Sequence, residues 1–133
     1  MMPGDDMKLA DADCMATIAV RDLEKAKSFY RDTIGLAPGP QAGPGVANFR
    51  SGNSTIVVYP SQYAGTNRAT AATFQVDDAE AVVNDLRSRG VTFEHYDDLP
   101  GLERRGDLHV HGSFKGAWFK DPDGNIIHVL SVG

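Results

Sequence analysis

The stretch Ala16-Thr17-Ile18-Ala19-Val20-Arg21-Asp22-Leu23-Glu24 returns 56 positions later as Ala72-Thr73-Phe74-Gln75-Val76-Asp77-Asp78-Ala79-Glu80. In both copies the side chains alternate with a period of two and then give way to an apolar stripe with a period near 3.6. That stripe comprises Leu23, Ala26, Phe29 and Tyr30 in the first copy, and Ala79, Val82, Val83 and Leu86 in the second. Each copy therefore predicts a strand followed by a helix.

The ends of both helices are marked by residues suited to those positions. Asp22 and Asp78 stand at the starts, where a carboxylate accepts hydrogen bonds from free backbone donors and faces the positive end of the helix dipole. Gly35 and Gly90 follow the stripes, and glycine suits the left-handed residue that ends a helix. The two copies thus share their helix boundaries as well as their strands.

A second pair of segments matches without gaps at an offset of 70, with Ala47, Phe49, Ile56 and Ser61 against Ala117, Phe119, Ile126 and Ser131. Turn-forming residues 121–125, Asp-Pro-Asp-Gly-Asn, separate two apolar runs and predict a β-hairpin, and residues 51–53 are the weaker counterpart. Each half then follows the order β-α-β-β-β. The chain is predicted to be an α+β protein made of two tandem modules.

We expect one domain over residues 13–133, preceded by a flexible lead-in over residues 1–12. Module one covers about residues 13–62 and module two about 69–133, and no long linker separates them. The offset grows from 56 to 70 because module two carries an inserted segment, about residues 98–115. This segment is the candidate lid.

The composition excludes several classes of function. Hydrophobic residues make up 41% of the 133, charged residues 23%, and the net charge is −5 with no basic stripe, so nucleic acid is not an expected partner. No apolar run approaches the roughly 20 residues of a membrane span, and the acidic N-terminus differs from a signal peptide. We expect a cytoplasmic protein, and the single cysteine, Cys14, is interpreted as a small buried residue opening a strand.

Two motifs carry a resemblance to a known family: the start Val20 to Tyr30 and the hairpin Phe-Lys-Asp-Pro-Asp-Gly-Asn from Phe119 to Asn125. Together with the duplication, they resemble the vicinal-oxygen-chelate superfamily, the glyoxalase, bleomycin-resistance and dioxygenase group. The resemblance implies the glyoxalase/bleomycin resistance/dihydroxybiphenyl dioxygenase-like fold, in which two βαβββ modules with curled mixed sheets enclose a cavity. It says little about function, because one fold hosts many activities.

In metal-binding members of this family, the resemblance places ligands at the head of the first strand and in the last strand of each module. Those positions are occupied here by Met15, Val58, Ala71 and His128. A divalent ion would accept only His128 among them, whereas a catalytic site normally needs about three protein ligands. We therefore predict no metal and no other cofactor, with a divalent ion disfavoured.

Strand alternation gives an independent view of the cavity. Ile18, Val20, Phe74 and Val76 belong to the face that covers the helices, which leaves polar side chains on the other face. The predicted ligand-binding cavity is lined by Met15, Thr17, Val58, Ala71, Thr73, Gln75, Trp118 and His128. Either Trp118 or Phe119 is available for stacking, and partly exposed sheet residues are the alternative interpretation of the polar positions.

Three residues of the inserted segment are further candidates: Arg104, His109 and His111. Arg104 with Arg105 could hold an anionic substrate, although a solvated loop is the favoured interpretation. His109 and His111 lie two apart and could chelate with His128, but histidines in a charged loop are mostly solvated. For His128 we expect a hydrogen-bonded pocket residue first, and a general base second.

Three functions remain open at this stage. The first is a metal-free binder or enzyme acting on a small organic molecule, as in the bleomycin-resistance branch. The second is a metal-dependent lyase or dioxygenase with rearranged ligands His109, His111 and His128. The third is a non-catalytic assembly protein. Whether the protein is an enzyme is left open, with His128 the best catalytic candidate, and the expected partners are a small-molecule ligand and a second copy in a homodimer.

Overall fold

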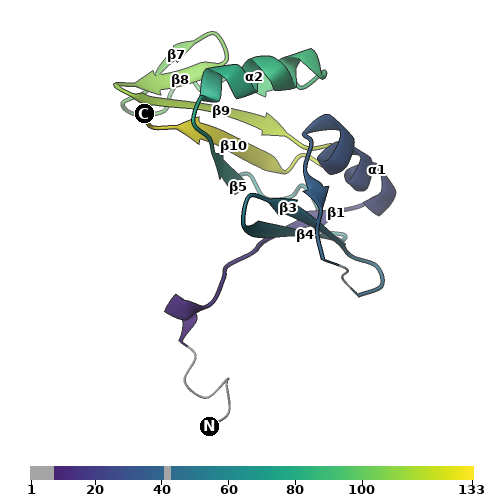
Figure 1. Cartoon of the computed structure of the whole chain (residues 1–133). Helices are drawn as coiled ribbons and strands as arrows, with labels where there is room; N and C mark the ends of the chain where they lie inside the picture. The colour runs from purple at the N-terminus through teal and green to yellow at the C-terminus, as the bar shows by residue number, and fades with distance from the viewer. Residues whose placement is uncertain (1–7, 41–42) are drawn as a thin grey trace.

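The computed structural model describes residues 8–40 and 43–133. Of the predicted lead-in, residues 1–7 lie outside the described part, and the rest includes a short 3₁₀ turn, η1 (Leu9–Asp11). This segment extends away from the sheets (Figure 1), and Leu9 is 92% exposed. No helix among the described residues is long and apolar enough to span a bilayer.

Module one follows the predicted order of elements. It consists of β1 (Ala16–Val20), α1 (Leu23–Ser28), the π-helical turn η2 (Phe29–Thr33), β2 (Ala37–Pro38), β3 (Ala47–Ser51) and β4 (Ser54–Pro60). The strands form one sheet in the order β1-β4-β3-β2, in which β1 and β4 are parallel and the other pairs antiparallel. The π-helical turn continues α1 and was not foreseen from the sequence.

Module two repeats this plan with an addition. It consists of β5 (Thr70–Gln75), α2 (Ala79–Ser88), β6 (Phe93–Glu94), β7 (Glu103–Arg105), β8 (Leu108–His111), β9 (Phe114–Lys120) and β10 (Ile126–Ser131). The sheet order is β5-β10-β9-β8-β7, and β6 pairs with another part of β9. The inserted segment is thus largely a β-hairpin, β7–β8, that widens sheet two.

The two modules differ by one residue in their last hairpin. Ala47 pairs with Val58 in module one, whereas its counterpart Ala117 pairs with Val129 in module two. The turn over residues 121–125 is one residue longer than its counterpart, so beyond it the offset is 71 and not 70. The structural counterpart of His128 is therefore Val57, which corrects the sequence-based alignment with Val58.

The helices begin and end where the sequence predicts. Asp22 accepts a hydrogen bond from the backbone of Lys25 at 3.2 Å, and Asp78 accepts one from Ala81 at 3.1 Å. Gly35 and Gly90 have φ of 80° and 93°, values at which a side chain would be strained. The caps confirm that both helices are specified locally.

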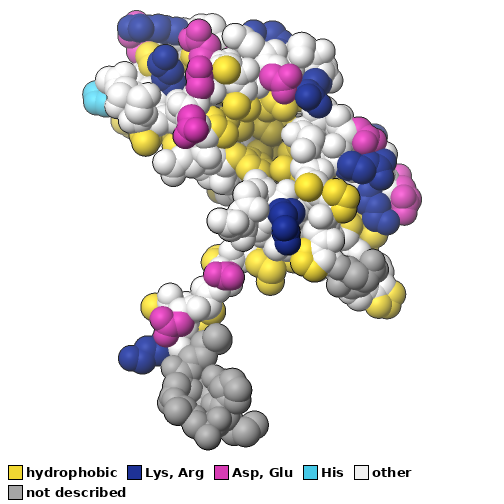
Figure 2. All heavy atoms as spheres, viewed as in Figure 1, with side chains coloured by type: hydrophobic (Ala, Val, Ile, Leu, Met, Phe, Trp, Pro, Cys, Tyr) yellow, Lys and Arg dark blue, Asp and Glu magenta, His cyan; other side chains and the backbone are white. Residues whose placement is uncertain are grey.

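One hydrophobic core unites the two modules, because α1 and α2 lie on the same side of their sheets as the inward strand residues. The core includes Ile18, Val20, Ala26, Tyr30, Phe49, Ile56, Val58, Val83, Leu86, Phe119, Ile127 and Val129. Hydrophobic side chains also gather in a shallow hollow near α2 (Figure 2), where Phe74, Val76, Val82 and others line a groove. The two modules therefore share one core, and its surface carries a shallow apolar groove.

A buried polar cluster joins the modules at the turn after β9. Tyr30 of module one donates a hydrogen bond to Asp121 at 2.7 Å, and both side chains are buried. Asn125 donates to Asp121 at 2.8 Å and to the carbonyl of Ala19, at the end of β1, at 2.7 Å. Burial and the Asp121 carboxylate raise the pKa of the Tyr30 phenol far above its usual range, so the phenol keeps its proton. The predicted turn motif thus also fixes how the two sheets meet.

Candidate functional site

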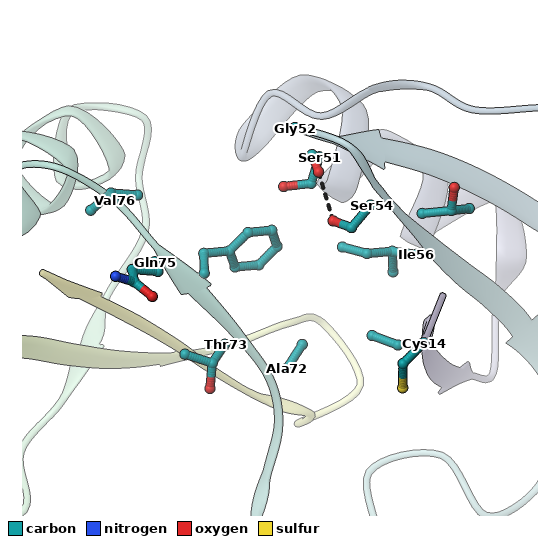
Figure 3. A pocket seen from close by; sticks show the side chains of 12 residues that line it. Cys14, Ser51, Gly52, Ser54, Ile56, Ala72, Thr73, Gln75 and Val76 are labelled. Carbon is teal, nitrogen blue, oxygen red and sulfur yellow. Dashed lines mark hydrogen bonds between the residues drawn. The ribbon is translucent and has the colours of Figure 1, made fainter. Parts of the chain in front are cut away.

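A cleft of about 420 Å³ lies between the two sheets, where the edge strands β1 and β5 approach one another. Its size falls within the range of small-ligand sites. In Figure 3, β5 lies on one side and Cys14, Ser51, Ser54 and Ile56 lie on the other. The lining from β5 and its end is Ala72, Thr73, Phe74, Gln75 and Val76. The lining combines apolar side chains with the hydroxyl groups of Ser51, Ser54, Thr55 and Thr73 and the amide of Gln75.

Two of the predicted cavity residues, Thr73 and Gln75, line this cleft. Met15 lies between two residues at its mouth, Cys14 and Ala16, but is itself 52% exposed. Thr17 and Ala71 are exposed as well, so neither is enclosed within a single chain.

Two expectations about residues near the cleft are wrong. Val58 is fully buried in the core and does not line a cavity, because β4 alternates and its neighbour Val57 takes the other face. Cys14 is exposed rather than buried, because it precedes β1 and has no sheet partner.

An aromatic stack lies on the same face of sheet two as Thr73, although its rings, Trp118 and His128, are not among the residues that line the cleft. His128 on β10 pairs with Thr73 on β5 and with Trp118 on β9, so all three side chains lie on one face of the sheet. The rings of Trp118 and His128 are parallel within 4°, with centroids 4.1 Å apart. Trp118 also donates from Nε1 to the hydroxyl of Thr70 at 3.2 Å. We call this pair of rings the Trp118–His128 stack.

His109 is buried against this stack, which contradicts the expectation that it lies in a solvated loop. It belongs to β8 and has no exposed surface, because its side chain points to the same face as Trp118 at a centroid distance of 4.9 Å. Its Nε2 accepts a hydrogen bond from the backbone of Tyr96 at 2.9 Å. The hairpin insertion therefore adds a wall of aromatic rings to the site.

Burial controls the charge of both histidines. It lowers the pKa of His128 to about 4, with a further contribution from His109. Burial likewise lowers the pKa of His109 below its ordinary value. Both rings are consequently neutral at pH 7. The site presents π surfaces and neutral hydrogen-bonding groups at these positions.

The other loop candidates lie outside the stack. Arg104 pairs with Asp97 at 2.6 Å and donates to the carbonyl of Gly106, so it is engaged within the hairpin region. Arg105 pairs with Glu103, and His111 is exposed. Phe119 is buried in the core, so of the two predicted stacking residues Trp118 is the one on the site face.

The residues present do not fit a divalent metal ion at the family's ligand positions. Met15 and Ala71 have no suitable donor atom. The same holds for the residue aligned with His128, which is Val58 by the sequence repeat and Val57 by the strand pairing. Across residues 8–40 and 43–133, no three His, Cys, Asp or Glu side chains come close enough to hold an ion. The alternative set His109, His111 and His128 is thus not assembled in this arrangement.

Sequence reasoning missed several contributors to the site. Thr70, Tyr96 and Gly116 contact the stacked rings or the histidines beside them, and Val57 replaces Val58. Strand alternation from Trp118 could have indicated Gly116. Tyr96 carried no signal, because it follows a strand of two residues.

A family model supports the predicted resemblance. The model described as Glyoxalase/Bleomycin resistance protein/Dioxygenase superfamily matches residues 14–129. No curated protein matches the sequence significantly.

Solved structures of similar fold include proteins of different activities. TnmS3, an antibiotic binding protein from Streptomyces sp. CB03234, is 24% identical, with a TM-score of 0.64 over 90% of this chain and 93% of that one. A glyoxalase/bleomycin resistance protein from the same organism is 24% identical, with a TM-score of 0.61 over 89% and 98%. Lactoylglutathione lyase from Agrobacterium tumefaciens is 18% identical, with a TM-score of 0.63 over 90% and 92%. At these identities the likeness shows the fold alone.

Proposed function

Because this chain belongs to the glyoxalase/bleomycin resistance protein/dioxygenase superfamily, we propose that it binds a small organic molecule in the cleft between its sheets without a divalent metal ion. The main support for this proposal is the Trp118–His128 stack. The one metal-competent position of the family's set is a histidine lying flat against an indole ring, with its Nε2 buried. A ring held in this way supports the indole of Trp118 from behind, and its buried Nε2 is poorly placed to take an ion from solvent.

The surroundings of the stack define the class of ligand. Trp118 is half-buried and therefore retains surface for contact with a planar, π-rich molecule. Thr73 and Gln75 on β5 offer hydrogen bonds beside it, and the cleft of about 420 Å³ continues from them. We propose an aromatic ligand with a few polar substituents. The fold that the chain shares with TnmS3, an antibiotic binding protein, makes antibiotics one class of candidate to test.

The first test uses the fluorescence of Trp118, the sole tryptophan of the chain. A panel of planar aromatic antibiotics, titrated into the protein, should include compounds that change the emission with saturable, one-to-one behaviour. Gln75→Ala should weaken such binding, whereas Tyr63→Ala, which removes an aromatic ring 68% exposed elsewhere, should leave it unchanged. Saturable binding equally tight in both variants would place the ligand outside the cleft.

The second test addresses the metal. Chelated protein is exposed to Ni, Zn, Mn or Fe salts, desalted and analysed for metal content. We expect far less than one ion per chain, because a single histidine holds such ions weakly. One tightly held ion per chain that disappears in His128→Ala would contradict the metal-free proposal and revive the metal-dependent lyase or dioxygenase.

Two further parts of the proposal concern assembly and compartment. We propose a homodimer, because β1 and β5 are edge strands and the exposed Met15, Thr17 and Ala71 need a second wall to enclose a ligand. Light scattering should give twice the mass of the 14.3 kDa chain. A cytoplasmic location fits the free thiol of Cys14. Whether the bound molecule is turned over is decided by product analysis with any ligand found.

A further inference from the structure

Two buried ring nitrogens beside the stack have no hydrogen-bonding partner within residues 8–40 and 43–133. They are Nδ1 of His109, which has no exposed surface, and Nε2 of His128, which is 9% exposed. Leaving a buried polar atom unsatisfied is costly, and natural structures contain few such atoms without a reason. The arrangement that keeps these rings out of water therefore needs an explanation.

Gly116 on β9 lies between the two histidines. It is the cross-strand partner of His109, and its own missing side chain would point to the face that carries Trp118 and His128. A methyl group on Gly116 would stand 2.7 Å from Nε2 of His128, and 3.0 Å from the ring of Phe114. The first distance is shorter than real Cβ contacts and the second is at the tight end of them, so His128 occupies the space that a side chain at position 116 would fill.

Backbone conformation does not account for this glycine. Nine other glycines of the described chain have positive φ, but Gly116 does not, so an alanine would suit its backbone. The glycine instead leaves free the space that a Cβ atom at position 116 would occupy. Phe114 borders the same space, with its ring centroid 6.2 Å from that of His128. The imidazole therefore has little freedom to shift aside.

We propose that Gly116 is a positioning residue of the ligand site: by lacking a side chain, it holds His128 flat against Trp118 and keeps both imidazoles out of water. This inference rests on the proposed function for its biological meaning, since it concerns the same stack. A side chain at position 116 would tilt the His128 ring toward solvent and remove the flat surface on which the ligand is proposed to rest.

The variant Gly116→Ala tests this in the free protein, so the result does not depend on finding a ligand. The titration of His128 is followed by the NMR signals of its ring protons. We expect its pKa to move from about 4 up toward the ordinary histidine value near 6.5, as the ring gains water. In this variant the emission of Trp118 should already be quenched as the pH falls below about 6.5, because protonated imidazole quenches a neighbouring indole. In the wild-type protein quenching should begin only near pH 4.

The matched control is Gly43→Ala, at a glycine with ordinary φ and no described atom near its added methyl group. It should leave the His128 titration and the Trp118 emission unchanged. A folded Gly116→Ala protein in which His128 still titrates near 4 would overturn the proposal. If the wild-type protein bound none of the aromatic ligands tested, the proposed function would be wrong, whereas the positioning role of Gly116 would be unaffected.

Should Gly116→Ala fail to fold, a double-mutant cycle with His128→Ala decides the matter. Removing the imidazole vacates the space that the new methyl group needs. The proposal predicts that Gly116→Ala/His128→Ala folds, with a urea midpoint close to that of His128→Ala alone. An alanine at 116 that destabilises both backgrounds equally would show that Phe114 or the backbone, and not His128, requires the glycine.

Discussion

The two modules share one scaffold and differ in what they carry on it. Both have a capped helix behind a sheet and an apolar set on the inner face. On the site face, however, module two has Trp118 and His128 where module one has Asn48 and Val57. Module two also has the β7–β8 hairpin, which buries His109. The comparison teaches that the duplication maintains the core, while a few site-face positions and one insertion supply the chemistry.

A second contrast concerns the turns. Asp121 in module two has Ser51 as its counterpart, whose backbone carbonyl accepts a hydrogen bond from the Ser54 hydroxyl within the same turn. Asp121 receives hydrogen bonds from Tyr30, from the side chain of Asn125 and from the backbone of the turn. Module two therefore supplies the turn that links the modules, and module one supplies the Tyr30 hydroxyl and the Ala19 carbonyl that this turn contacts.

The largest effect is expected from Asp121→Ala. Losing the carboxylate leaves buried donors on Tyr30 and Asn125 without an acceptor, so the free energy of unfolding should fall by about 3 kcal/mol. Chemical denaturation measures this. Ser51→Ala, at the counterpart position, is the control and should change stability by less than about 0.5 kcal/mol. Similar losses of unfolding free energy in the two variants would contradict the inference that Asp121, and not Ser51, links the modules.

Next comes a pH effect confined to module two. The unfolded His128 ring titrates near 6.5 and the folded one near 4, so the unfolded chain binds more protons between those values. Stability should therefore fall as pH decreases from 6.5 to 4, by about 2 to 3 kcal/mol from this residue, and the contribution is fully present above 6.5. His128→Val, which installs the residue of module one, should remove that share.

The control for this pH effect is His111→Val, which removes an exposed histidine from the same sheet. Its unfolding free energy should follow the wild-type pH profile. A His128→Val profile that also parallels the wild type would mean that the ring is accessible to water in the folded protein.

A smaller effect is expected from exchanging the stacking residue. Trp118→Ala should weaken binding of an aromatic ligand roughly tenfold or more, about 1.4 kcal/mol, because the indole provides the contact surface. Isothermal calorimetry measures this without the tryptophan signal. Asn48→Ala, at the counterpart position of module one, should lower affinity much less. Equal losses would indicate that the ligand spans both modules symmetrically.

The smallest effect should be the same in both modules. Asp22→Ala and Asp78→Ala each remove one helix cap, at a cost of about 1 kcal/mol in the free energy of unfolding. Thermal denaturation of the two variants should give similar shifts. A clearly larger loss for one of them would show that the helices differ in how much their sheets support them.

The extent of prediction from sequence follows the range of the interactions involved. The helix caps, Gly35, Gly90 and the inward strand residues are specified by their immediate neighbours, and the structure confirms them. The register of β10 was misplaced by one residue, because a turn can lengthen without leaving a gap in an apparent repeat. The error exchanged Val57 for Val58 and so exchanged the two faces of a strand.

The duplication, the βαβββ plan of each module, the family and the lack of donors at the family's metal positions follow from the amino-acid sequence, because they depend on local periodicity and residue type. The burial of His109 in a hairpin expected as a loop, the stacking of His128 on Trp118 and the link that Asp121 makes between the modules are visible in the folded chain alone. Each of these depends on a partner from another strand or the other module. Burial and pKa are set by such partners, and spacing along the chain does not specify them.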